Sequence, residues 1–302
     1  MNYINLFIVG AAKAGTTFLY EWLRAHPEVG MPHHEVMKEP GIFAPMTGRR
    51  ITVDQYIKYI KEYEQKRWLG DASTAYLTEP SAAQRIHQYN PEAKIIVVLR
   101  NPVDRAYSLY NWMVQEGYEW APTFHKALEL EEKRKRRLKK SFWMPEYPYN
   151  YLYKYSGLYF DQLMRYFNQF NPDQIKIVIY DHLKNNPHRE LQNLSQFLYL
   201  EDNEPEIEQE SNPSLNVRSS VRQFMVRKAL VKAIEPLTQM VKGPQATYEL
   251  RRSLIESGWK SEKPKPISPS LKNELCLFFK ENIIKIESYL QIKLNNWYNT
   301  CN

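Results

Sequence analysis

The chain has 302 residues, of which 43% are hydrophobic and 25% are charged, a composition that excludes disordered and fibrous proteins and favours one globular domain over residues 1–302. Its net charge of +7 favours a polyanionic ligand without identifying one. Only two cysteines are present, which excludes a disulfide framework and favours a reducing cytoplasm.

A strand, a glycine loop and a helix open the chain. The apolar run NLFIVG (5–10) predicts a buried strand, and Phe18, Leu19, Trp22 and Leu23 have the spacing of the helix that follows, with Thr16 or Thr17 as its N-cap. Gly10 and Gly15 have the spacing of a Walker A loop. Thr16, however, occupies the lysine position of that loop, and the nearby lysine is Lys13.

A second junction of the same kind follows at KIIVVLRNPVDRAYSLY (94–110). Its apolar strand ends at Arg100, and Asn101 and Pro102 are typical of the N-cap and first position of a helix. Ser108 lies on the polar face of that helix, eight residues after Arg100. Arg100 and Ser108 are suited to binding a phosphate.

Strands alternate with helices along the first two thirds of the chain. A third strand is predicted at 175–180, after an amphipathic segment at 159–170, and helices are predicted at 187–199, 219–235 and 270–290. The expected fold is therefore α/β, with a mostly parallel central sheet flanked by helices and a largely helical C-terminal third. In such a sheet the carboxyl ends of the strands share one edge, where ligands bind. The glycine loop after the first strand and Arg100 at the end of the second both lie at that edge.

The motifs resemble those of the sulfotransferases that use 3′-phosphoadenosine 5′-phosphosulfate. GAAKAGTT (10–17) is similar to their 5′-phosphosulfate loop, RNPVDRAYSLY (100–110) to their 3′-phosphate motif, and KEPGIF (38–43) to their K-E-P-x-F-F element. SGLYFDQL and its continuation (156–183) resemble a further stretch of the family. The resemblance is nearest to glycosaminoglycan-type enzymes and their bacterial and cyanobacterial relatives, and it implies a P-loop-like fold.

The resemblance also implies roles for individual residues. The loop residues Lys13, Ala14, Gly15, Thr16 and Thr17 bind the 5′ end of the donor, and Arg100 and Ser108 bind its 3′-phosphate. Lys13 stabilises the charge that develops on the leaving phosphate. Glu39 is the general base that activates the acceptor. The product is 3′,5′-adenosine bisphosphate, and no metal is expected.

The acceptor is the least determined part of the hypothesis. A hydroxyl is expected in preference to an amine, on a small molecule or a carbohydrate, and one role is the tailoring of a natural product. Glycosaminoglycan-type enzymes carry a functional lysine where DASTAYL (71–77) has Ala72. The aromatic segment 142–160 is either a wall of the acceptor site or part of the core.

Two other functions fit parts of the sequence. A P-loop kinase or nucleotide hydrolase fits the glycine spacing, but Thr16 in the lysine position opposes it. A nucleic-acid-binding protein fits the charged run 131–140, which is more typical of a solvated helix face.

His33 and His34 lack the spacing of a metal site. We expect no nucleic-acid or membrane partner and a cytoplasmic location, and the oligomeric state is left open.

Overall fold

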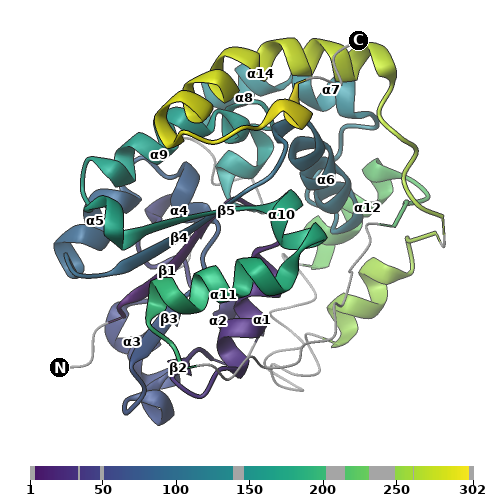
Figure 1. The fold of residues 1–302 in the computed structure, drawn as a ribbon. Helices are drawn as coiled ribbons and strands as arrows, with labels where there is room; N and C mark the ends of the chain where they lie inside the picture. Colours follow the sequence, from purple (N-terminus) through teal and green to yellow (C-terminus); the bar gives the residue numbers. More distant parts are fainter. Residues whose placement is uncertain are drawn as a thin grey trace. The chain divides into compact units, whose positions relative to one another are not determined.

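Five strands form one sheet in the computed structural model of the protein (Figure 1). They are β1 (Leu6–Gly10), β2 (Val29–Gly30), β3 (Trp68–Asp71), β4 (Lys94–Leu99) and β5 (Ile175–Ile179). Their order is β2-β3-β1-β4-β5, and each pair of neighbours is parallel. The predicted parallel sheet is confirmed, and the carboxyl ends of its strands share one edge.

The structure describes residues 4–32, 35–47, 51–138, 146–201, 215–230, 249–260 and 262–298. The chain divides into two compact units, each described by itself below. The first unit comprises residues 1–105, 158–210 and 281–294, and the second comprises 106–157, 211–280 and 295–302. The single domain expected over residues 1–302 stays a prediction.

Complete burial explains why β1 and β4 are continuous apolar runs. Leu6, Phe7, Ile8 and Val9 have no exposed surface, and the same holds for residues 95–99. Strands that are covered on both faces have no polar face to alternate with. The runs therefore predicted these strands, whereas β2 and β3, at two and four residues, are too short to carry such a pattern.

Helices flank the sheet in the first unit. They are α1 (Thr16–Ala25), α2 (Glu35–Lys38), α3 (Val53–Tyr59), α4 (Ala75–Thr78), α5 (Ala82–Tyr89), α9 (Tyr159–Phe167), α10 (Tyr180–Asn185) and α11 (Pro187–Leu198). Short 3-10 turns occur at Pro45–Thr47, Lys61–Tyr63 and Pro172–Gln174. Helices α1 and α4 contact β1, and α11 contacts β5. The predicted helix at 187–199 is confirmed as α11.

The second unit is mainly helical among its described residues. It contains most of α6 (Pro102–Gln115), then α7 (Phe124–Glu129), α8 (Glu131–Lys135), α12 (Ser220–Ala229) and the greater part of α14 (Pro269–Leu290). Its 3-10 turns are Pro148–Tyr151, Tyr155–Gly157 and Asn295–Trp297. The predicted helices at 219–235 and 270–290 correspond to α12 and α14, although residues 231–235 lie outside the described part of the chain.

Aromatic side chains form the core of the second unit. The ring centroid of Phe124 lies 5.4 Å from that of Tyr110 and 5.9 Å from that of Tyr153. Tyr147, Tyr149 and Tyr151 are also buried. Residues 146–157 of the aromatic segment therefore contribute to the core of this unit. Residues 142–145 lie outside the described part of the chain. The alternative role of the segment, as a wall of the acceptor site, stays a prediction.

A buried ion pair joins the charged run to this core. The carboxylate of Glu119 is fully buried and accepts two hydrogen bonds of 2.7 Å from the guanidinium of Arg134 and one of 2.8 Å from the hydroxyl of Tyr153. Glu131 is also buried, and accepts hydrogen bonds from the backbone amides of Lys154 and Tyr155. The expected solvated face is therefore wrong for these two members of the run.

None of the described helices is both long enough and apolar enough to cross a bilayer. The 22-residue helix α14 has the length, but it carries several lysines and glutamates. The cytoplasmic location stays a prediction.

Replacing Arg134 by leucine should lower the free energy of unfolding by about 3–5 kcal/mol, because Glu119 is then left buried without its cationic partner. Urea unfolding at neutral pH measures the change. The control is Lys133→Leu, an exposed position on the same helix, where the change should stay within about 0.5 kcal/mol. Similar small losses in both variants would show that the pair does not stabilise this unit.

Candidate functional site

The loop between β1 and α1 needs glycine at position 15. Gly15 is the N-cap of α1 and has a φ of 91°, in the left-handed region that favours glycine. A Cβ atom on Gly15 would lie 2.8 Å from Cδ2 of Tyr180, at the start of α10. The loop therefore passes too close to Tyr180 for any side chain at this position.

The N-terminus of α1 is left open to an anion. No side chain caps it, and its first turn contains no acidic residue. The prediction that Thr16 or Thr17 is the N-cap is wrong, because the left-handed Gly15 takes that place and both threonines lie within the helix. The amides of a first helical turn lack partners inside the helix, and together with the helix dipole they bind anions.

Two other loop residues have well-defined roles in the backbone. Lys13 has a φ of 66° and is half-buried, so the backbone turns at this residue. The amide of Ala14 donates a hydrogen bond of 3.2 Å to the carbonyl of Ala11, which closes a turn inside the loop. The Ala14 amide is thus engaged here, and its predicted contact with the donor stays a prediction.

Arg100 joins the second junction to the first. Its Nη1 atom donates a hydrogen bond of 3.0 Å to the carbonyl oxygen of Lys13. Its guanidinium also lies over the ring of Tyr180, 4.7 Å from the centroid, and its own carbonyl accepts a 2.9 Å hydrogen bond from the hydroxyl of Tyr159. The arginine is thereby held against the glycine loop, and the binding of one donor by both motifs stays a prediction.

The helix after Arg100 begins as predicted. The side chain of Asn101 accepts a hydrogen bond of 3.0 Å from the amide of Val103, and α6 starts at Pro102. Ser108 is half-buried on the same helix and belongs to the second unit. Its contact with the 3′-phosphate stays a prediction.

Glu39 is attached to the carboxyl end of β3. Its Oε2 atom accepts a hydrogen bond of 2.9 Å from the hydroxyl of Thr74. Nearby, the hydroxyls of Ser73 and Tyr76 each donate a 2.6 Å hydrogen bond to the carboxylate of Asp71, and Ser73 also accepts one of 2.9 Å from the amide of Gly41. The segment that carries Glu39 is therefore fixed to the end of β3.

Sequence reasoning identified Lys13, Arg100 and Glu39 but missed the residues that hold them. Thr74 is 35 positions from Glu39, Ser73 is 32 positions from Gly41, and Tyr180 follows a different strand from Arg100. The place of Thr74, Ser73 and Tyr180 in the sequence could have identified them, because each lies at or just after the carboxyl end of a strand. Ligand-binding residues of a parallel sheet usually lie there.

Comparison with known proteins identifies the family. A model for the sulfotransferase domain matches residues 4–285. The chain belongs to the sulfotransferase family. The crystal structure of a sulfotransferase from Alicyclobacillus acidocaldarius has a TM-score of 0.70 and 26% sequence identity, and the similarity covers 97% of this chain and 98% of that one. The predicted P-loop-like sulfotransferase fold is confirmed.

Curated relatives match the chain over parts of their length. Membrane-associated sulfotransferase kil1 from Dictyostelium discoideum is 32% identical over 114 residues, which are 37% of this chain and 23% of that protein. Human bifunctional heparan sulfate N-deacetylase/N-sulfotransferase 2 is 27% identical over 203 residues, which are 64% of this chain and 22% of that protein. The chain thus spans less than a quarter of the length of these relatives.

Burial makes Asp71 an unusual carboxyl group in this sulfotransferase. Loss of solvation raises its pKa from 3.8 to about 7, against the hydrogen bonds from Ser73 and Tyr76, which lower it. The negative charge of Glu39 raises the pKa further. The two acids therefore differ in environment: Asp71 is fully buried, whereas Glu39 is partly exposed.

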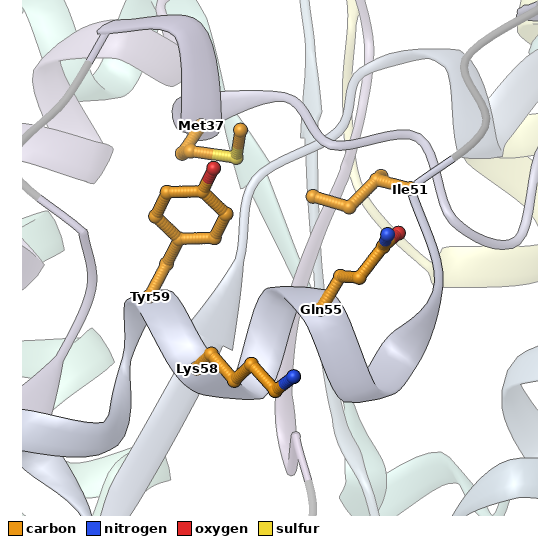
Figure 2. Close-up of a pocket in the computed structure, with 5 residues that line it drawn as sticks. All are labelled: Met37, Ile51, Gln55, Lys58 and Tyr59. Carbon is orange, nitrogen blue, oxygen red and sulfur yellow. The ribbon is translucent and has the colours of Figure 1, made fainter.

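A surface cavity lies beside the segment that carries Glu39 (Figure 2). It has a volume of about 480 Å³ and is lined by Met37 from α2 and by Ile51, Gln55, Lys58 and Tyr59 on and before α3. Figure 2 shows the thioether of Met37 close to the hydroxyl end of Tyr59. None of the predicted site residues is among the described residues that line this cavity.

The expectation of a site without metal stays a prediction. His33 and His34, the residues considered as metal ligands, lie outside the described residues.

Asp71→Asn should remove a pH dependence from the stability of the fold. Asp71 keeps its proton up to about pH 7 in the folded protein, whereas in the unfolded chain it loses the proton near pH 3.8. The contribution of Asp71 to the free energy of unfolding is therefore fully present below pH 4 and is lost as the pH rises through 7. Relative to the variant, the wild type should lose on the order of 4 kcal/mol between pH 4 and pH 8. Urea unfolding across this range measures the difference.

The exposed acid Asp54 provides the matched control, since Asp54→Asn should leave the pH profile of stability unchanged. A difference between wild type and Asp71→Asn that is the same at every pH would mean that Asp71 titrates normally in the folded protein.

Proposed function

We propose that the protein is a sulfotransferase that transfers a sulfonate group from 3′-phosphoadenosine 5′-phosphosulfate to a hydroxyl, in preference to an amine, of a small-molecule or carbohydrate acceptor. The observation that carries this proposal is the hydrogen bond between Arg100 and the carbonyl of Lys13. It brings two anion-binding motifs together at one edge of the sheet. The donor has two anionic groups, one at each end of an adenosine, and so requires two such motifs.

The chain's own residues fit this donor. The glycine loop leaves no room for a Cβ at position 15, and the uncapped first turn of α1 offers the amides of Thr16 and Thr17 to the 5′ end. Arg100 binds the 3′-phosphate, together with Ser108. A guanidinium has five N–H donors, so the bond to Lys13 leaves Arg100 able to bind phosphate in a bidentate manner.

The transfer is an in-line displacement at sulfur. A bond forms between the acceptor oxygen and sulfur, and the bond between sulfur and the bridging oxygen breaks, so its electron pair goes to the leaving phosphate. Glu39 takes the proton of the acceptor hydroxyl, and Thr74 holds the carboxylate for this step. Lys13 meets the negative charge that develops on the bridging oxygen.

The names of the curated relatives bear on the chemical class of the acceptor. Curated relatives include carbohydrate sulfotransferase 15 from mouse and heparan sulfate sulfotransferases. Their names support a carbohydrate as one acceptor class. Ala72, buried at the end of β3, departs from the lysine of the glycosaminoglycan-type pattern, and this departure favours an acceptor outside that group, such as a natural product.

Calorimetry tests the donor. The protein should bind 3′,5′-adenosine bisphosphate tightly without metal, and more tightly than ATP with magnesium or duplex DNA. Arg100→Ala should weaken the bisphosphate by about ten- to a hundredfold, as for a charge-assisted hydrogen bond, while adenosine 5′-phosphate should change much less. Preference for ATP with magnesium would sink the proposal, and equal losses for both nucleotides would misplace the 3′-phosphate site.

Glu39→Gln tests the base. We expect turnover to fall by about 10²- to 10⁴-fold, because glutamine keeps the size of the side chain and cannot take up the proton. Binding of the bisphosphate should remain within about twofold of the wild type. An acceptor screen with labelled donor provides the assay, and turnover within about threefold of the wild type would remove Glu39 from the mechanism.

A further inference from the structure

Lys38, next to the proposed base, reaches the donor loop from another element. Its Nζ atom donates a hydrogen bond of 2.5 Å to the hydroxyl oxygen of Thr17, in the first turn of α1. The ammonium also lies 5.2 Å from the ring centroid of Tyr20, one turn further along the same helix. The hydroxyl of Tyr20 donates in turn to the carbonyl of Pro32. Lys38 is therefore held against the start of α1 by two side chains of that helix.

The Lys38 ammonium adds positive charge to the N-terminal end of α1. The N-terminus of a helix carries a partial positive charge, and acidic residues usually offset it. The first turn of α1 has none, and Lys13 adds a second cation to the loop before it. The end of Lys38 has thus been brought to a region that already attracts anions.

The contact also determines what the hydroxyl of Thr17 can do. Its oxygen accepts a hydrogen bond from an ammonium group, so its own proton must be donated elsewhere. Thr17 is the second residue of α1 and is exposed, and its hydroxyl can therefore donate beside the first-turn amides. An ammonium that donates to a hydroxyl polarises it and strengthens its donation to a third group.

We propose that Lys38 is a second cation of the 5′-phosphosulfate site, which binds the donor directly and through the hydroxyl of Thr17. The inference rests on the proposed function and assigns to Lys38 a role at the donor, whereas its neighbour Glu39 serves the acceptor. The two side chains have different partners: Lys38 bonds to α1, and Glu39 bonds to Thr74 after β3. A donor that draws Lys38 toward the loop therefore also fixes the backbone that carries the base.

Lys38→Met tests the inference with two nucleotides that differ at the 5′ end. The variant should bind 3′,5′-adenosine bisphosphate about ten- to a hundredfold more weakly than the wild type, because a charge-assisted contact is lost. Adenosine 3′-phosphate, which has no 5′ group, should bind the wild type and the variant with affinities within twofold. Calorimetry measures the first, and ligand-observed NMR at millimolar concentration measures the second.

Three further variants separate this role from a general effect. Lys61→Met removes an exposed lysine of the same unit and should leave both affinities unchanged, which controls for net charge. Lys38→Arg keeps the charge and should recover part of the bisphosphate affinity. Thr17→Val should reduce the effect of Lys38→Met when the two are combined, because the hydroxyl carries part of the interaction.

The outcomes also separate this inference from the proposed function. If the wild type and Lys38→Met bind the bisphosphate equally well, the role of Lys38 is overturned and the proposed function stands. Equal losses for the two nucleotides also overturn it, since the effect is then not at the 5′ end. Wild type that binds neither nucleotide overturns the proposed function and the role of Lys38 together.

Discussion

The hydrogen bond from Arg100 to the carbonyl of Lys13 is the interaction on which the candidate site depends. Both residues follow neighbouring parallel strands, so the sheet alone brings their segments to one edge. The bond, and the ring of Tyr180 beneath the guanidinium, then fix the distance between a loop suited to one anion and a side chain suited to another. A ligand with one phosphate needs only half of this arrangement.

The fold could be predicted from the sequence where burial leaves a pattern. β1, β4 and β5 are apolar runs, and α6 begins at an Asn-Pro pair, so each carries a local signal. β3 carries no such signal, since Gly70 interrupts a strand of only four residues. Because β3 was not predicted from the sequence, Asp71 at its carboxyl end was not predicted either. The N-cap of α1 was placed wrongly because threonine is the commoner cap, whereas a left-handed glycine beside Tyr180 depends on a contact that only the folded chain makes.

The part of the site around Glu39 depends on pairs that are distant in the chain. Glu39 meets Thr74 across 35 positions, and Gly41 meets Ser73 across 32. No period or spacing rule connects such residues, and the family motif predicted Glu39 without its partners. The structure adds a physical distinction between the two acids of this region. Burial keeps Asp71 protonated to about pH 7, whereas the side chain of Glu39 is partly exposed.

The backbone of Lys13 connects the glycine loop to Arg100. Thr16, in the position of the Walker A lysine, is the first residue of α1 and is only 5% exposed. Lys13 is half-buried in the loop, and its left-handed backbone turns its carbonyl toward Arg100. A non-glycine residue has an energetic cost in this conformation, and the bond to Arg100 helps to offset it. Because the bond uses the carbonyl of residue 13, the connection between the two motifs depends on the left-handed turn of the loop and not on the lysine side chain.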